Sequence, residues 1–317
     1  MAITLLDAKV GMADKVDQQV VDMFRRNSVL LDNMVFDNVI CPGTGGSTLT
    51  YGYVQLRSPS LASVRGVGEE FLPGEAIREQ LTANAVIMGG SFQVDRVLQN
   101  TAGAADELAF QAEQKIKATA NCFHNLAING TVSNDGFDGL NALLQGTDSE
   151  VFGDVALLTE DDMQAHYNIF LDHLDRMLAR LDGVPSMLLM NTEMLIKLRS
   201  IARRAGCYER TTDGFGRPVE TYAGIPLVDV GKYFDGETTC DVIPTDEDGN
   251  TSIYAVCLGL DGLHGISPQG NGVIVSYMPD LNAPGAVKTG EVELVAGIVL
   301  KNTRKAAVLR DITIQDV

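Results

Sequence analysis

The longest regular alternation of apolar and polar positions runs over residues 104–129. The segment is rich in Ala, Gln, Glu and Lys, which favour helix. Asn129-Gly130 tolerates the left-handed backbone that ends a helix. The pattern therefore predicts one long helix with a single apolar seam at close to helical spacing, formed by Leu108, Ala112, Ile116, Thr119, Phe123 and Ala127.

Three shorter segments also carry helical patterns. Apolar positions from Val16 to Leu31 indicate an amphipathic helix over 14–31. Thr159-Glu-Asp-Asp162 has the form of a capping box, with Asp in place of the usual Glu or Gln, and opens a second helix. Asn191 or Thr192 caps a third.

Alternating positions predict two strands in the first third of the chain. Residues 47–57 place Tyr51 and Tyr53 on one face, and residues 85–98 form a second strand with a bulge or bend at Gly89-Gly90. About two dozen polar or turn-prone residues join them, which is long for a compact domain. Because two such strands are unstable alone in water, they need a partner surface. They form either a protruding hairpin or a flap over the protein's own core.

The rest of the chain predicts an α/β unit over 151–290 and two closing strands. A basic turn, 301–305, separates these last two strands, at 291–300 and 306–309. The remaining strands are expected at 186–190, 223–229, 253–258 and 272–277, with a loop at 213–218.

Three short sequence segments resemble those of a known family. A long helix that runs into Asn129-Gly-Thr131 and then Gly136-Phe-Asp-Gly-Leu140 resembles the spine helix of tailed-phage major capsid proteins, which have the Hong Kong 97-type fold. Leu189-Met-Asn191 before a capped helix, and Tyr222-Ala-Gly-Ile-Pro-Leu-Val228, are similar to that family's axial domain. The resemblance covers nearly the whole chain by order of elements and short phrases.

The resemblance implies an α+β chain with the Hong Kong 97-type capsid fold. Its expected parts are an N-terminal arm, an extended β-hairpin loop, a peripheral domain with a long spine helix, and an axial α/β domain. The corresponding boundaries are 1–41 for the arm, 42–98 for the extended loop, 99–150 for the peripheral domain, 151–290 for the axial domain, and 291–317 for a peripheral-domain strand and a closing strand.

The function implied is that of a major capsid protein of a tailed double-stranded DNA bacteriophage. Its chains would self-assemble as hexamers and pentamers into the icosahedral head shell, in the host cytoplasm and then in the virion. Portal protein and scaffolding or decoration proteins would be partners, and packaged DNA would be contacted without sequence preference. An encapsulin, which forms a bacterial compartment shell, shares the fold and is the first alternative. A cytosolic α+β enzyme with an unrecognised site is the second.

Charge and composition argue against several classes of protein. The formal net charge of −18 argues against a protein that reads DNA sequence with a basic stripe, but it does not argue against a container for DNA. No apolar run approaches the roughly 18 residues of a membrane helix, so no membrane partner is expected. The five cysteines form no Cys-x-x-Cys pair and are expected to be reduced thiols.

Reactive groups do not converge in any recognisable motif, so we expect no catalytic, metal or cofactor-binding residues. The glycine-rich stretch 42–48 lacks the lysine of a phosphate loop. His166 and His173 are seven residues apart on one expected helix, too far to share one ion. Residues 246–250 lack the ligand spacing of a calcium loop and indicate a solvated acidic turn.

The extended loop is where intersubunit contacts are expected. Because the chain has no lysine between Lys15 and Lys115, the loop cannot supply the lysine that some capsid proteins use for an isopeptide cross-link. Non-covalent contacts must then hold the shell. The charged residues expected to contact a neighbouring subunit are Arg57, Arg65, Glu69, Glu70 and Arg78.

Overall fold

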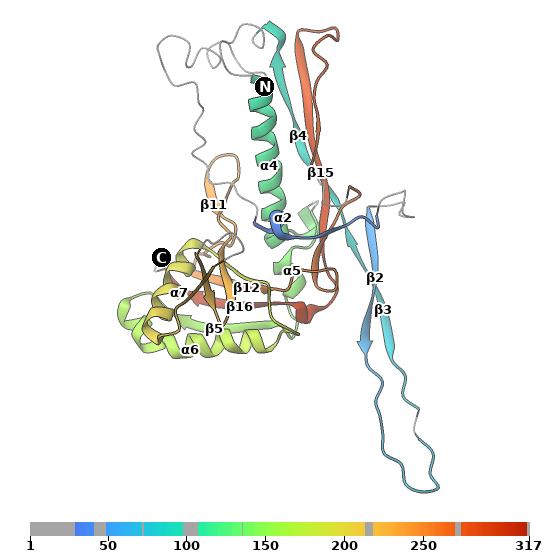
Figure 1. Ribbon diagram of the computed structural model, residues 1–317, viewed down its shortest axis with the longest axis vertical. Helices are drawn as coiled ribbons and strands as arrows, with labels where there is room; N and C mark the ends of the chain where they lie inside the picture. Colours follow the sequence, from blue (N-terminus) through green and yellow to red (C-terminus); the bar gives the residue numbers. More distant parts are fainter. Residues whose placement is uncertain are drawn as a thin grey trace.

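The computed structural model describes residues 29–40, 49–71, 73–97, 107–134, 136–212, 218–269 and 274–315. These residues form an upright arm, a sheet with helices at its base, and a thin hairpin that points away from both (Figure 1). The arm is built on α4 (Glu107–Asn129), the long helix that the sequence predicts. The first predicted residues, 104–106, lie outside the described residues.

The predicted seam of α4 is confirmed, since five of its positions are buried and Ile116 packs partly buried beside them. The helix ends where expected, and Gly130 N–H donates to Leu126 O at 2.8 Å. A Cβ atom at Gly130 would lie 2.4 Å from that oxygen and 2.5 Å from Phe137 O. Glycine is required here because the chain turns back against the helix.

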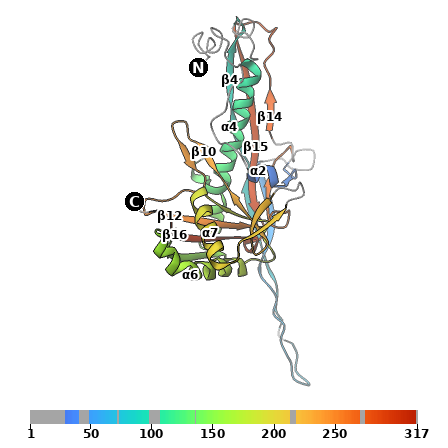
Figure 2. The same cartoon turned by 60° about the vertical axis from the view of Figure 1, so that its left-hand side comes forward.

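A five-stranded sheet runs along α4. Its central strand, β15 (Val287–Leu300), pairs along one edge with β4 (Val86–Asp95). The other edge of β15 pairs with β14 (Ile274–Tyr277) and β13 (Leu263–Ile266), and β13 pairs in turn with the short β1 (Phe36–Asp37). Phe92, Val94 and Val292 face the helix and pack on Leu108 and Ala112. Figure 2 shows the helix lying along this ribbon from a second side.

A seven-stranded sheet lies at the base of the arm, in the order β5-β16-β12-β6-β9-β8-β7. Alternate residues of its central strands belong to two cores. Leu188 and Leu309 face α6 and α7, whereas Leu189 and Val308 face α4 and α5. The strands are β5 (Glu150–Ala156), β6 (Met187–Met190), β7 (Glu209–Thr212), β8 (Pro218–Tyr222), β9 (Ile225–Asp229), β12 (Asn250–Val256) and β16 (Ala306–Thr313).

The predicted helix starts in this region are confirmed. α6 (Glu160–Ala179) begins at a capping box in which the side chains of Thr159 and Asp162 satisfy each other's backbone N–H groups. α7 (Thr192–Ala205) is capped by Asn191. The remaining short elements are α5 (Leu140–Leu144), η2 (Val132–Asn134), η3 (Thr303–Lys305), β10 (Lys232–Phe234) and β11 (Thr239–Asp241).

Two predictions fall largely outside the described residues. Of the helix expected over 14–31, the structure describes only its last residues, in α2 (Val29–Asn33). The loop expected at 213–218 is described only at Pro218, where β8 begins. By contrast, the strands expected at 186–190, 223–229, 253–258 and 272–277 are confirmed as β6, β9, β12 and β14.

The predicted strand pairing of the hairpin is wrong. β2 (Thr50–Ser58) pairs with β3 (Ile77–Asn84), which the sequence pattern had assigned to the connection. β4 instead belongs to the five-stranded sheet, because Met88, Phe92 and Val94 give it an apolar face for that core. β3 was missed because IREQLTAN has no such face.

Of the bulge or bend expected at Gly89-Gly90, the bulge is wrong, since β4 and β15 pair in continuous register. Gly89 is needed for another reason. Its φ is 151°, and a Cβ atom there would lie 2.0 Å from Val292 O. Glycine at this position therefore permits the two backbones to approach closely.

Candidate intersubunit surface

The β2–β3 hairpin projects beyond the rest of the described chain (Figures 1 and 2). At its root, Tyr51 is buried and Tyr53 is partly buried. Beyond Tyr53 no residue of β2 is buried, and most of β3 is exposed. The outer hairpin therefore has no core of its own, and an isolated two-stranded hairpin is only marginally stable in water.

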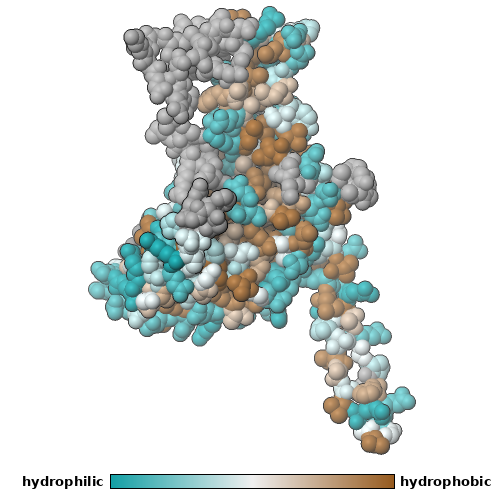
Figure 3. Space-filling model, viewed as in Figure 1, coloured by the Kyte–Doolittle hydropathy of each residue, from teal (hydrophilic) through white to brown (hydrophobic). Residues whose placement is uncertain are grey.

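Exposed apolar side chains are concentrated on this hairpin. Eight of the 23 exposed large hydrophobic residues of the described chain fall within 49–77. Val64 and Val67 are completely exposed, at 100% and 108%. Figure 3 shows apolar residues at intervals along the hairpin down to its tip. Such a concentration marks an interaction surface. The eight residues are Leu49, Val54, Leu56, Leu61, Val64, Val67, Phe71 and Ile77.

The predicted contact residues of β2 and β3 lie near the outer ends of the two strands, away from the root of the hairpin. Arg57 falls in a register shift between Leu56 and Ser58, and its guanidinium lies 3.9 Å from the carboxylate of Glu79. The two side chains are 70% and 49% exposed, so this pair contributes about 0–1 kcal/mol. Arg78 lies opposite Leu56 and is exposed.

The tip is an ordered turn. Arg65 Nη1 donates to Glu69 O at 2.9 Å, and the guanidinium stacks 5.2 Å from the ring centroid of Phe71. The Glu69 carboxylate accepts a hydrogen bond from Gly66 N at 3.2 Å. Gly68 adopts a φ of 89°, which favours glycine. Arg65 and Glu69 thus organise the turn that presents Val64 and Val67.

The five predicted residues therefore do not form one cluster. Arg65 and Glu69 meet at the tip, while Arg57 and Arg78 lie on the strands. Glu70 is exposed beside the tip, and within the described hairpin neither Glu70 nor Arg78 forms an ion pair. The exposed apolar residues were not among the contact residues predicted from the sequence, although Val64, Val67 and Phe71 in an otherwise polar connection were a usable signal.

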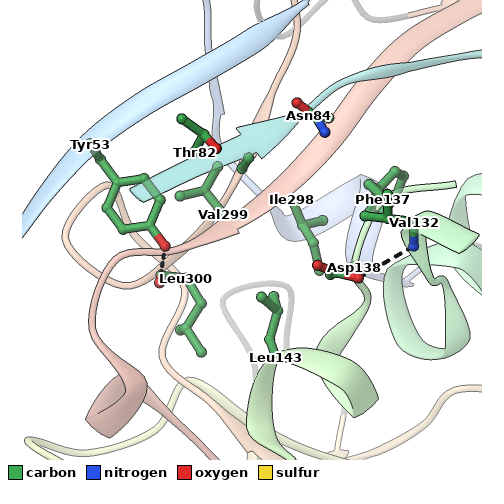
Figure 4. A pocket seen from close by; sticks show the side chains of 11 residues that line it. Tyr53, Thr82, Asn84, Val132, Phe137, Asp138, Leu143, Ile298, Val299 and Leu300 are labelled. Atoms are coloured by element: carbon green, nitrogen blue, oxygen red, sulfur yellow. Dashed lines mark hydrogen bonds between the residues drawn. The ribbon is translucent and has the colours of Figure 1, made fainter. Parts of the chain in front are cut away.

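The hairpin root is anchored by a small core. Tyr51 and Ala85 pack with Ile40, Ile266 and Val299. Two longer-range hydrogen bonds support it, from Ala85 N to Leu49 O at 2.8 Å and from Tyr53 Oη to Leu300 O at 3.4 Å. Figure 4 shows a pocket of about 50 Å³ beside this root. It is lined by Tyr53, Thr82, Ala83, Asn84, Val132, Phe137, Asp138, Leu143, Ile298, Val299 and Leu300.

Elsewhere the polar groups have structural roles. His166 Nδ1 lies 3.1 Å from Ala156 O. The carboxylate of Asp246 accepts hydrogen bonds from Asp248 N and Asn250 N at 3.0 and 2.7 Å, which makes the acidic turn. Over the part of the chain that the structure describes, no group of three or more His, Cys, Asp or Glu is placed to hold a metal ion. None of the described helices is long and apolar enough to cross a membrane.

The fold is the Hong Kong 97-type capsid fold, and it is shared with solved shell structures. Solved structures match the chain over almost its full length. A chain of the holo-SrpI encapsulin complex from Synechococcus elongatus is 15% identical, with a TM-score of 0.67, covering 98% of this chain and 97% of that one. A chain of Mycobacterium phage Bobi is 13% identical, with a TM-score of 0.64 and 99% of both chains covered.

The capsid of Myoviridae phage XM1 is a further match, at 13% identity and a TM-score of 0.60, covering 93% of this chain and 95% of that one. No family model matches the chain. A search of curated proteins gives no match either. The predicted α+β, Hong Kong 97-type capsid fold is confirmed.

Proposed function

We propose that the chain is the major capsid protein of a tailed double-stranded DNA bacteriophage and self-assembles into the icosahedral head shell. The observation that carries this proposal is the protruding hairpin with its eight exposed large apolar side chains. A hairpin with no core of its own becomes stable when it lies on another surface. In a protein with a shell-forming fold, a second copy of the chain supplies that surface.

Magnitudes favour the apolar residues over the charged ones as the main source of contact energy. Each large apolar side chain that becomes fully buried contributes about 1.5–3 kcal/mol. Each exposed ion pair contributes about 0–1 kcal/mol. The five charged residues expected from the sequence would then set the position of the hairpin on its neighbour, while Val64, Val67 and Phe71 would supply most of the affinity.

The parts of the fold correspond to the expected parts of a capsid subunit. In this proposal the β2–β3 hairpin is the extended loop, α4 is the spine helix of the peripheral domain, and the seven-stranded sheet with α6 and α7 is the axial domain. Hexamers and pentamers would form around the axial domains. Portal protein, any scaffolding or decoration protein and the packaged DNA would be its partners, first in the host cytoplasm and then in the virion.

An encapsulin shell is the second candidate. The similarity to the Synechococcus elongatus encapsulin complex over 98% of the chain favours it. Most of the other similar structures are phage or GTA capsids, which favours the phage proposal. In either candidate the exposed hairpin would lie on a second copy of the chain, so the hairpin does not distinguish them.

Negative-stain electron microscopy of the purified chain, expressed alone and with its neighbouring genes, tests the proposal. Closed icosahedral shells, or rings of five or six subunits, are the expected result. Large shells that package DNA when portal and packaging genes are present would identify a phage head. Small closed shells formed by the chain alone, with a co-purifying enzyme inside, would favour the encapsulin. A monomer under every condition would refute both.

A further inference from the structure

The strands β13, β2 and β1 and the turn that follows β15 come together around His264. This residue has no role in the surface described above. His264 lies in β13 and is fully buried. The ring of Tyr51, from the hairpin root, stands edge-on to the imidazole with 5.9 Å between centroids. Tyr51 Oη donates to Asp37 Oδ2 at 3.4 Å, in β1. The Lys301 ammonium, which follows β15, lies 5.5 Å from the centre of the Tyr51 ring.

Only one of the two nitrogens of the His264 imidazole has a hydrogen-bond partner. Nδ1 lies 3.4 Å from Gly262 O, so we assign the proton of the neutral ring to Nδ1. Nε2 is buried without a hydrogen-bond partner. A proton added at Nε2 would thus create a buried N–H donor with no acceptor and a buried positive charge, both of which are costly.

The charged groups around the imidazole act in opposite directions. Burial lowers the pKa of His264 below its ordinary value of 6.5, and the Lys301 ammonium lowers it further. The contact with Gly262 O and the Asp37 carboxylate act against this shift. On β2, Tyr51 contributes a neutral ring rather than a charge to this junction.

We propose that His264 makes the attachment of the β2–β3 hairpin and of β1 sensitive to pH, so that protonation of its imidazole releases Tyr51 and Asp37 from the body. In the docked state the Tyr51 ring stands edge-on against the buried imidazole and helps to keep water from it. When Tyr51 moves away, Nε2 reaches solvent and the charged ring becomes hydrated. The inference concerns a single copy of the chain and holds whether or not that copy builds a shell.

The direction of the pH effect follows from linkage. The released state has the ordinary histidine pKa and the docked state a lower one, so the released state binds more protons as the pH falls. Docking is therefore fully stable above about pH 6.5 and weakens as the pH falls below that value toward the docked pKa. Each pKa unit between the two states raises the opening constant about tenfold.

Hydrogen exchange measured by mass spectrometry tests this on the purified full-length chain at pH 7.5 and 5.5, in one assembly state checked by size exclusion. After correction for intrinsic rates, peptides covering residues 36–40 and 49–53 should lose protection at the lower pH, while peptides from α6 should not. In the His264→Gln variant, which cannot titrate, the protection of these peptides should not change with pH. His124→Gln, at a buried histidine 3.0 Å from Val230 O, is the matched control and should keep the wild-type response.

Two further variants keep the inference testable if His264→Gln does not fold. Asp37→Asn keeps an acceptor for Tyr51 but removes the negative charge, so the loss of protection at pH 5.5 should grow. Lys301→Gln removes the positive charge, so the loss should shrink. Equal protection at both pH values in the wild-type chain, or the same loss in His264→Gln, would overturn the inference.

Discussion

Asn191 connects three parts of the molecule through one side chain. Its Oδ1 accepts a hydrogen bond from Met194 N at 2.8 Å and so caps α7. Its Nδ2 donates to Thr251 Oγ1 at 3.0 Å, in β12, and to Ile243 O at 3.3 Å. The residue is only 2% exposed, so water cannot replace these partners.

Replacing Asn191 by Ala should lower the free energy of unfolding by about 2–3 kcal/mol, because the change removes a helix cap and leaves buried polar groups unpaired. Thr159→Ala is the matched control, since Thr159 caps α6 at an exposed position and its loss should cost about 1 kcal/mol. Urea denaturation of the unassembled subunit measures both. Equal losses would mean that the contacts to Thr251 and Ile243 contribute little.

These two caps show what could be predicted from the sequence and what could not. Both caps were predicted because a cap depends on residues within one turn of helix. The bond from Asn191 to Thr251 spans 60 residues, and no local pattern indicates it. The same limit explains His264, whose neighbours come from positions 37, 51 and 301 and are joined by the fold alone.

The hairpin shows that local sequence patterns can also misplace a whole strand. Its existence was predicted from a long polar connection, but its second strand was assigned to the wrong segment. A strand pattern depends on an apolar face, and β3 has none, since most of its residues are exposed in the described chain. β4 has the clearer pattern because its partner, the α4 core, is internal. The predicted pairing therefore followed the stronger signal.

Replacing both Val64 and Val67 by Ser should abolish or greatly weaken assembly and leave the subunit folded. The two side chains are fully exposed, so their loss removes no contact within the subunit. Electron microscopy should show few particles, while thermal unfolding of the subunit should be unchanged. Val184→Ser, at a residue 79% exposed on another surface, is the control and should assemble normally. Normal assembly of the double variant would refute the role given to the tip.

The consecutive strands β15 and β16 connect the five-stranded sheet to the seven-stranded sheet. β15 is the central strand of the five-stranded sheet and β16 lies between β5 and β12 in the seven-stranded sheet. Only the short turn with η3 separates them. In the proposed shell we expect non-covalent packing, within and between subunits, to supply the stability, because the hairpin has no lysine to offer for a cross-link.

Purified particles, boiled in detergent and reducing agent, should therefore give a single band at the mass of the chain, 34.0 kDa, on a denaturing gel. The lack of lysine from residue 16 to residue 114 is the reason. A ladder of covalent oligomers would contradict this expectation. Adding a lysine-reactive cross-linker to the same particles provides the positive control for such a ladder.

The position of β15 and β16 along the chain also has a consequence for synthesis. β15 pairs with β4, about 200 residues earlier, and β16 pairs with β5, about 160 residues earlier. The five-stranded sheet is complete only after residue 300 has left the ribosome, and the seven-stranded sheet only after residue 313, so neither sheet can form in full until late in translation. Chains interrupted before residue 300 lack part of β15, the central strand of the five-stranded sheet, and chains interrupted between there and residue 313 lack part of β16. Proteases would remove these fragments before they joined an assembly, which limits the material available for a shell to finished chains.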